Sequence, residues 1–331
     1  MKIFFFSAKP YDKLFFDRVN QNYGFDIEYH ETHLGPHIVN AVENAEAVCV
    51  FVNDKLSAEV IEVLASRGVK IIALRCAGFN NVNLEAAKKF NMAVCRVPSY
   101  SPEAVAEHTV AMLLTINRKT HKAYNRVREQ NFSLNGLLGY NLNGKTIGVI
   151  GTGKIGKAFI KIMRGFGCRI LAHDVFPDST LAQEINYCSL EEVLRASDII
   201  SLHCPLTKEN HYLINKQTLV LMKQGVTIIN TSRGGLINTV DIIEALKTKK
   251  VGALCIDVYE QEEKLFFRDL SANIIDDDNI QRLMSFPNVL ITAHQAFFTE
   301  EALSEIAQVT LNNISLLQQN KMPKDSPTLL S

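Results

Sequence analysis

Three glycines at fixed spacing form the clearest chemical pattern in the sequence. Gly151, Gly153 and Gly156 follow the apolar run 146–150 and open a helix-forming segment, 157–166. In such a G-x-G-x-x-G turn the first glycine permits a tight turn, and the second lets a pyrophosphate approach the backbone. The third lets the helix and strand pack closely. The free N–H groups of the following helix would bind the phosphates. The pattern predicts a dinucleotide site.

An aspartate follows at the end of the next apolar run. Asp174 lies eighteen residues after Gly156, close to the spacing of roughly 20 residues that is typical of this fingerprint. Its carboxylate could accept hydrogen bonds from the adenosine ribose hydroxyls and would repel a 2′-phosphate. The next residues are Val175 and Phe176 rather than arginine, so the sequence favours NAD over NADP.

Three further polar segments, each at the end of an apolar run, could act on a carbonyl group. Arg233 supplies a cation, Glu262 a carboxylate, and His294 a group that exchanges protons near neutral pH. Singly, each has a plain structural explanation: a surface charge before a turn, part of an acidic run, or a histidine at a strand end. Together, after a dinucleotide fingerprint, they supply what ketone reduction by hydride transfer requires.

The elements that must position these residues alternate between strands and helices. Short runs rich in β-branched residues recur with helix-length segments between them, which favours parallel sheets covered on both faces. The expected strands are 2–6, 47–52, 69–74 and 92–97 in a first set, and 146–150, 169–172, 198–202, 226–230, 253–258 and 289–292 in a second. We therefore expect an α/β fold with two doubly wound, Rossmann-like domains.

The boundary between the two domains is not at the midpoint of the chain. A turn-rich stretch, 98–102, precedes a long helix expected over 103–117, with Ser101 as its N-cap and Pro102 at its first position. A second apolar-periodic helix is expected over 300–319 and could return to the first domain. The sequence thus indicates a discontinuous arrangement.

Composition limits the classes of partner. The chain has 331 residues, 47% hydrophobic and 21% charged, with 35 basic and 35 acidic side chains and a net charge of zero. The length suits two domains of about 150 residues. A neutral chain lacks the electrostatic footprint of a nucleic-acid or anionic-membrane binder.

No apolar run reaches the roughly 18 residues of a membrane span, and the first one is shorter than a signal-peptide core. We expect a cytoplasmic protein that acts on a small molecule, with no nucleic-acid or membrane partner.

The cysteines also indicate a cytoplasmic protein. There are seven, an odd number, and none forms a Cys-x-x-Cys pair. We therefore expect reduced thiols rather than a disulfide framework, and no metal site.

Several spaced motifs, in order, resemble the D-isomer-specific 2-hydroxyacid dehydrogenases. They are RCAGFNNVN at 75–83, VPSYSPEAVAEHT at 97–109, GVIGTGKIG at 148–156, NTSRGG at 230–235, DVYEQE at 257–262 and TAHQAF at 292–297. The resemblance covers essentially the whole chain and is strongest to the lactate-forming members. It implies a substrate domain made of residues 1–100 and 298–331, with an NAD-binding domain, 101–297, inserted between them.

Carried over residue by residue, the resemblance assigns the reaction to three side chains. Arg233 would bind the carboxylate of a 2-oxo acid and polarise its ketone, a task that suits the fork of donors on a guanidinium. His294 would donate a proton to the ketone oxygen as hydride arrives from NADH, and would act as the base in the reverse direction. Glu262 would orient His294 and favour its protonated form. Glu260 is the nearest alternative partner.

The same resemblance implies further substrate contacts. Backbone N–H groups around Ala77 and Gly78 would form a second clamp on the carboxylate. Phe51, Tyr100 and Phe297 would fill the pocket at the substrate's C3 end, which favours a methyl group and hence pyruvate. The alternative is that these rings pack a hinge between the domains.

The resemblance also implies a set of cofactor contacts. Asp257 would accept from the nicotinamide carboxamide, although a capping role is an alternative. The other implied residues are Lys154 and Ile155 at the pyrophosphate, Cys204, Pro205 and Asn210 in the loop beside the adenosine ribose, and Thr231, Ser232 and Arg233 along the nicotinamide half.

These expectations combine into one function with two alternatives. The expected activity is NADH-dependent reduction of pyruvate to D-lactate in fermentation, by a homodimer or tetramer that associates through the helix 103–117. A related enzyme could act instead on glycerate, hydroxyisocaproate or another 2-hydroxy acid. A protein of another class, an NAD(H)-sensing binding protein, is the second alternative, since some transcriptional co-repressors share this fold.

Overall fold

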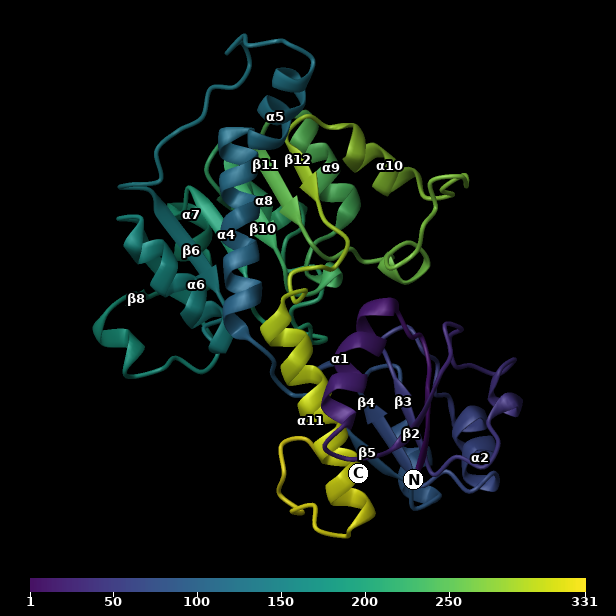
Figure 1. Ribbon diagram of the computed structural model, residues 1–331. Coiled ribbons are helices and arrows are strands. Elements are labelled where there is room, and N and C mark those ends of the chain that lie inside the picture. Colours follow the sequence, from purple (N-terminus) through teal and green to yellow (C-terminus); the bar gives the residue numbers. More distant parts are fainter. The chain divides into compact units, whose positions relative to one another are not determined.

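Two parallel sheets organise the chain in the computed structural model, which describes residues 1–331 except for the side chain of Lys264. Packing divides the chain into one unit of Met1–Ser101 with Phe297–Ser331 and a second unit of Pro102–Ala296. In each sheet every paired strand runs parallel to its neighbours. The predicted α/β fold class with two Rossmann-like sheets is therefore confirmed (Figure 1).

The first unit has a five-stranded sheet in the order β2-β1-β3-β4-β5. Its strands are β1 Lys2–Phe5, β2 Asp26–Tyr29, β3 Ala47–Val50, β4 Ile71–Leu74 and β5 Ala93–Cys95, and its helices are α1 Pro10–Asn20, η1 Val39–Ala41, α2 Ala58–Ser66, α3 Leu84–Lys89 and α11 Glu300–Gln318. Helix α11 packs beside α1 and contacts β4 and β5 (Figure 1). The carboxy-terminal helix thus completes a unit whose sheet comes from the first hundred residues.

The second unit has a seven-stranded sheet in the order β12-β11-β10-β9-β6-β7-β8. Its strands are β6 Thr146–Ile150, β7 Arg169–His173, β8 Asn186–Tyr187, β9 Ile199–Leu202, β10 Val226–Asn230, β11 Val251–Ile256 and β12 Val289–Ile291. Its helices are α4 Pro102–Arg118, α5 Thr120–Arg128, α6 Lys154–Gly165, η2 Leu181–Gln183, α7 Leu190–Ala196, α8 Lys216–Leu221, η3 Gly234–Leu236, α9 Thr239–Lys247, η4 Glu262–Lys264 and α10 Asp278–Ser285.

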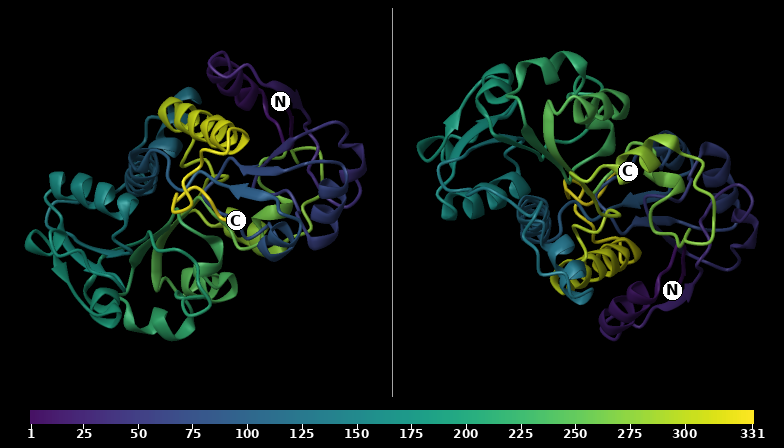
Figure 2. Two further views of the ribbon diagram at one scale, coloured as in Figure 1. Left: turned by 90° about the horizontal axis from the view of Figure 1, so that it is seen from below. Right: turned by 90° about the horizontal axis from the view of Figure 1, so that it is seen from above.

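Alternate strand residues of the second unit serve two separate cores. Ile228 packs on one face with residues of α7, α9 and α10, whereas its neighbour Ile229 packs on the other face with residues of α4 and α6. Helices therefore cover both faces of the sheet (Figure 2), which explains why its strands read as continuous apolar runs.

The strand order places the polar loops of the second unit along one edge. The order in which the chain adds strands to the sheet reverses between β6 and β9, and in doubly wound sheets ligands bind beyond the carboxyl ends of the strands at such a switch point. The glycine turn follows β6, and the segments containing Arg233, Glu262 and His294 follow β10, β11 and β12. All of these loops lie at the same edge because the strands are parallel.

Two strands and several boundaries differ from the prediction. Strands β2 and β8 were not expected, because each is a short edge strand with polar residues and lacks a strong apolar run. Strand β11 ends at Ile256 rather than at residue 258, so Asp257 belongs to the loop. No helix of the part of the chain that the structure describes is long and apolar enough to cross a membrane.

Candidate active site and cofactor cradle

The glycine turn after β6 has the geometry that a dinucleotide requires. Gly151 has a φ of 95°, and a Cβ on it would lie 2.5 Å from the backbone N of Cys204. A Cβ on Gly156 would lie 2.1 Å from the Gly151 carbonyl oxygen, whereas a Cβ on Gly153 would meet no heavy atom within 4 Å. Gly153 N-caps α6 without a side-chain hydrogen bond. Close backbone packing thus requires glycine at positions 151 and 156. Gly153 leaves open space at the N-terminus of α6, where the amides of Lys154 and Ile155 can meet a phosphate.

Asp174 is held rigidly just beyond β7. Its Oδ2 accepts hydrogen bonds from the Thr152 N–H at 2.5 Å and the Thr152 hydroxyl at 2.9 Å, and its Oδ1 accepts from the Phe176 N–H at 2.9 Å. Burial raises the pKa of this carboxyl, but the hydrogen bonds outweigh that effect and hold it below its ordinary value. An ionised, fixed carboxylate beside the glycine turn fits the ribose of NAD.

The loop after β9 is tied to the loop after β10. The Ser232 hydroxyl donates to the Cys204 carbonyl at 2.6 Å. Asn210 closes the first loop on itself, because its Nδ2 donates to the Pro205 carbonyl at 2.7 Å and its Oδ1 accepts from the Thr207 N–H at 2.7 Å. These residues shape the cradle through backbone contacts that the sequence alone did not indicate.

Thr231 is held from a helix rather than from a loop. Its hydroxyl and that of Thr109 on α4 lie 2.8 Å apart, and both residues are buried. The contact anchors the start of the loop that carries Ser232 and Arg233.

His294 and Glu262 form a pair in the second unit. His294 Nδ1 lies 2.8 Å from Glu262 Oε1, and the other carboxylate oxygen accepts the Tyr259 N–H at 2.9 Å. Glu260, by contrast, accepts the Tyr212 hydroxyl at 2.9 Å. A carboxylate only accepts hydrogen bonds, so the proton of this pair lies on Nδ1 and Nε2 remains for other partners.

Asp257 organises the turn that presents His294. Its buried carboxylate accepts the Thr292 hydroxyl at 2.5 Å and the N–H groups of Gln295 and Ala296, each at 2.9 Å. Its carbonyl accepts the His294 N–H at 2.7 Å, and His294 adopts a left-handed φ of 53°. Burial raises the pKa of Asp257, but these hydrogen bonds and one from His108 hold it below the ordinary value. The observed contacts are those of a capping residue.

Sequence reasoning did not single out His108. Its Nε2 lies 3.2 Å from the Thr292 hydroxyl and 3.5 Å from Asp257 Oδ1, so it joins α4 to the His294 turn. It lies within the motif VPSYSPEAVAEHT, but nothing in its spacing distinguished it from an ordinary helix residue.

Arg233 lies between β10 and η3 with an exposed side chain. Its Nη1 donates to the Ser232 carbonyl at 2.7 Å, and its own carbonyl accepts from Asn230 Nδ2 at 2.8 Å. A Cβ on the adjacent Gly234 would lie 2.1 Å from the Tyr259 carbonyl carbon. Glycine therefore lets the Arg233 loop pack against the loop that leads to Glu262.

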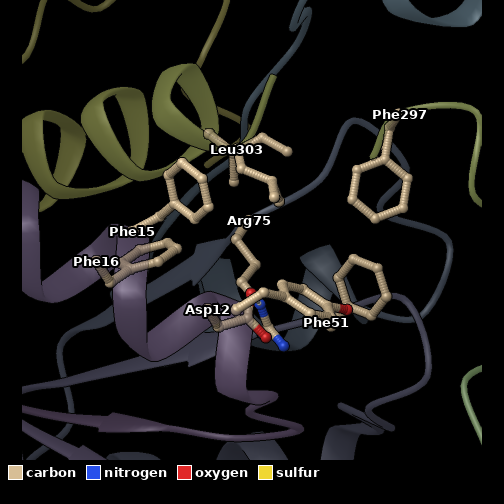
Figure 3. Close-up of a pocket in the computed structure, with 9 residues that line it drawn as sticks. Asp12, Phe15, Phe16, Phe51, Arg75, Phe297 and Leu303 are labelled. Atoms are coloured by element: carbon tan, nitrogen blue, oxygen red, sulfur yellow. Dashed lines mark ion pairs between the residues drawn. The ribbon is translucent and has the colours of Figure 1, made fainter. Parts of the chain in front are cut away.

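The first unit contains the remaining predicted substrate residues. Tyr100 and Phe297 pack edge to face with ring centroids 6.1 Å apart. Phe51 and Phe297 line one hollow together (Figure 3), whose other lining residues are Tyr11, Asp12, Phe15, Phe16, Arg75, Leu303 and Ile306. Ala77 and Gly78 follow β4 in a loop of the same unit.

A buried polar network holds Phe51. Its N–H donates to Asp54 Oδ2 at 2.6 Å, its carbonyl accepts from Asn81 Nδ2 at 2.9 Å, and its ring centroid lies 4.8 Å from the guanidinium of Arg75. Arg75 itself is buried and pairs with Asp12, with Nε 3.4 Å from Oδ1 (Figure 3). Sequence reasoning missed both charged residues, which read as an ordinary strand end and helix start.

Comparison with known proteins shows the family to which the chain is similar. Residues 110–296 match the family described as D-isomer specific 2-hydroxyacid dehydrogenase, NAD binding domain. A 2-hydroxyacid dehydrogenase homolog of Schizosaccharomyces pombe is 53% identical over 326 residues, which cover 98% of each chain. The solved structure of D-lactate dehydrogenase from Escherichia coli matches with a TM-score of 0.91 at 48% identity, covering 100% of both chains.

A second solved structure, from work identifying the pyruvate reductase of Chlamydomonas reinhardtii, matches with a TM-score of 0.93 at 41% identity over 98% of each chain. The family match spans more than half of this chain and includes the glycine turn, Asp174, Arg233, Glu262 and His294. The chain therefore belongs to the D-isomer specific 2-hydroxyacid dehydrogenases, and it is an oxidoreductase that uses NAD.

Proposed function

We propose that this protein is a D-lactate dehydrogenase that reduces pyruvate to D-lactate with NADH. The observation that supports this most directly is the pair formed by His294 Nδ1 and Glu262 Oε1 at 2.8 Å. The pair leaves Nε2 as the nitrogen that exchanges a proton with a substrate. The names of the E. coli and Chlamydomonas proteins support lactate and pyruvate as the substrates.

Three side chains carry out the reaction in this proposal. Bound NADH supplies the hydride that adds to C2 of pyruvate. Arg233 binds the substrate carboxylate with its forked donors and polarises the ketone. His294 donates the Nε2 proton to the ketone oxygen, and Glu262 stabilises the positive charge that the imidazole carries before the transfer. In the reverse direction neutral His294 accepts the proton of the lactate hydroxyl.

The backbone of Ala77 and Gly78 provides a second clamp for the carboxylate in this proposal. The N–H groups of these two residues make no hydrogen bond within the described part of the chain. Donors without a protein partner in a partly exposed loop are suited to an anion, because an oxygen of the substrate can accept from both.

Phe51, Tyr100 and Phe297 set the size of the substrate side chain in this proposal. Phe297 is buried, and Phe51 is held from its backbone and its ring face. Rings fixed in this way make a short pocket that accepts a methyl group more readily than a branched chain, and one methylene changes such discrimination by about 1–3 kcal/mol.

In this proposal the loops after β6, β7, β9, β10 and β11 would hold NAD. The N-terminus of α6 would hold the pyrophosphate, Asp174 would accept from the adenosine ribose, and Asp257 would accept from the carboxamide while it holds the His294 turn. The other contacts come from Cys204, Pro205, Asn210, Thr231, Ser232 and Arg233. In this proposal residues 101–297 form the NAD-binding domain, and residues 1–100 with 298–331 form the substrate domain.

We also propose that the enzyme works in fermentation, in the cytoplasm, as a homo-oligomer. All seven cysteines are free thiols, as is usual in a reducing compartment. The apolar face of α4, where we expected the subunit contact, is buried within its own unit. Exposed apolar side chains follow it instead, at Tyr124, Phe132, Leu134 and Leu138, and these are the better surface for a second copy.

A spectrophotometric assay tests the proposed reaction. NADH oxidation is followed with pyruvate, hydroxypyruvate and 2-oxoisocaproate, and the product is resolved on a chiral column. We expect the highest kcat/KM with pyruvate and D-lactate as the product. A preference for hydroxypyruvate or 2-oxoisocaproate would reject the lactate assignment, and absence of NADH oxidation with any 2-oxo acid would support the NAD(H)-sensing alternative.

A further inference from the structure

Two successive peptide groups in the loop after β4 are held by the segment that follows β5. The Cys76 carbonyl accepts a hydrogen bond from the Val97 N–H at 3.2 Å. The next carbonyl, that of Ala77, accepts from Arg96 Nη1 at 2.9 Å. Both donors come from the two residues that follow β5, so the residue pair Arg96–Val97 anchors this loop through its carbonyl oxygens.

The anchored carbonyls determine where the neighbouring N–H groups point. The described residues contain no cis peptide bond, and in a trans peptide the C=O of one residue and the N–H of the next point in opposite directions. The Cys76 carbonyl therefore directs the Ala77 N–H away from Val97, and the Ala77 carbonyl directs the Gly78 N–H away from Arg96. Neither of these two N–H groups makes a hydrogen bond within the described residues.

Arg96 is itself held in place. Its guanidinium lies over the ring of Phe79, 5.0 Å from the centroid. Its backbone N–H donates to the Thr328 carbonyl at 2.8 Å, and its carbonyl accepts from Asn313 Nδ2 at 3.1 Å. The Phe79 ring thus holds the guanidinium of Arg96, and Thr328 and Asn313 hold its backbone.

The charge of Arg96 adds to this geometry. A cation that donates to a carbonyl polarises that peptide group, and the N–H on its other end becomes a stronger donor. The Gly78 N–H therefore becomes a stronger hydrogen-bond donor, although the Arg96 side chain itself does not lie beside the substrate.

We propose that Arg96 is a positioning residue for the substrate carboxylate, which acts through the Ala77–Gly78 peptide. This inference rests on the proposed function of that peptide as a carboxylate clamp. Arg96 touches no reacting atom; it orients and polarises the N–H groups that meet the substrate's anionic end.

The test compares Arg96→Met with Arg67→Met. Arg67 serves as the control because its Nη1 also donates to a backbone carbonyl of the same unit, that of Val42, at 3.0 Å. The measurements are pyruvate KM and kcat, NADH Kd, and the inhibition constant of oxamate, an unreactive isostere of pyruvate. We expect Arg96→Met to raise the pyruvate KM and the oxamate constant by roughly tenfold or more, with NADH Kd within about twofold of the wild type. Arg67→Met should change none of them.

The outcomes separate this inference from the proposed function. If the wild type reduces no 2-oxo acid, the proposed function fails. If the wild type reduces pyruvate but Arg96→Met keeps its oxamate constant, the positioning role is wrong. Should Arg96→Met fail to fold, Arg96→Lys decides, because its ammonium cannot both donate to Ala77 and lie flat on Phe79. An oxamate constant equal to that of the wild type would then overturn the inference.

Discussion

The imidazole of His294 and the carboxylate of Glu262 lie 2.8 Å apart, Nδ1 to Oε1. A backbone N–H fixes the second oxygen of Glu262, and Asp257 fixes the turn of His294. Both partners are thus oriented before any substrate binds, which is the arrangement that efficient proton transfer requires.

Replacing either partner should reduce turnover without loss of cofactor binding. We expect His294→Gln to lower kcat for pyruvate by roughly 10²–10⁴-fold, because the proton donor is removed. Glu262→Gln should lower it less, since glutamine still accepts from Nδ1 but carries no charge. Glu260→Gln is the matched control and should retain turnover, because Glu260 pairs with Tyr212. Stopped-flow kinetics and NADH titration measure both quantities; equal losses for Glu260→Gln and Glu262→Gln would contradict the assignment.

Two glycines of the turn should have different roles, Gly156 in the stability of the fold and Gly153 in the binding of NADH. Gly156→Ala places a Cβ 2.1 Å from a backbone oxygen and should lower the unfolding free energy by about 1–3 kcal/mol. Gly153→Ala meets open space, so it should leave stability nearly unchanged and weaken NADH binding by roughly tenfold, about 1.4 kcal/mol. Urea denaturation and NADH fluorescence titration distinguish the two. If Gly153→Ala binds NADH as the wild type does, the pyrophosphate lies elsewhere.

Asp174 should set the choice between NADH and NADPH. Asp174→Ala removes the ribose acceptor and the charge that repels a 2′-phosphate, so the kcat/KM ratio of NADH to NADPH should fall by roughly tenfold or more. Asp174→Asn removes the charge at nearly constant size, and its one oxygen can accept from either the Thr152 or the Phe176 N–H but not from both, since these donate to different oxygens of Asp174. An unchanged ratio in both variants would show that another group determines cofactor preference.

Phe297 should limit the length of the substrate side chain. Phe297→Ala enlarges the pocket, and we expect kcat/KM for 2-oxoisocaproate relative to pyruvate to rise by about 10–200-fold, which corresponds to about 1–3 kcal/mol. Phe298→Ala is the control, because that neighbouring ring is 48% exposed and is not among the residues that line the hollow in Figure 3. Equal selectivity in the two variants would favour a purely structural role for Phe297.

His203, which follows β9 directly and precedes Cys204, should make the fold less stable in mild acid. Burial of the imidazole lowers the pKa of His203 to about 3, whereas an unfolded histidine titrates near 6.5. The folded state therefore binds fewer protons than the unfolded state between these values. The contribution to stability is complete above about pH 6.5 and is lost as the pH falls.

This effect is measured by urea unfolding at pH 6.5 and pH 5. The wild type should lose about 1–2 kcal/mol more than His203→Gln over this interval, since each pH unit is worth at most about 1.4 kcal/mol for one group. Parallel losses in both proteins would assign the acid sensitivity to other residues.

The sequence by itself determined the α/β class, the glycine turn and the order of the polar loops. These features are local: β-branched runs form strands, glycine spacing forms the turn, and parallel strands bring their following loops to one edge of a sheet. Arg233, Glu262 and His294 stood out because each follows a strand. The edge strands β2 and β8 escaped prediction because edge strands need no continuous apolar run.

Only the tertiary structure decided which group each side chain meets. Glu260 and Glu262 are two residues apart, and their partners, Tyr212 and His294, come from different loops. Arg96 reaches the Ala77 carbonyl across nineteen residues of chain. Such pairings depend on how the loops within each unit pack, because hydrogen bonds form between groups that are close in space rather than in sequence. The sequence therefore indicated which side chains to consider, and packing determined which groups lie in contact.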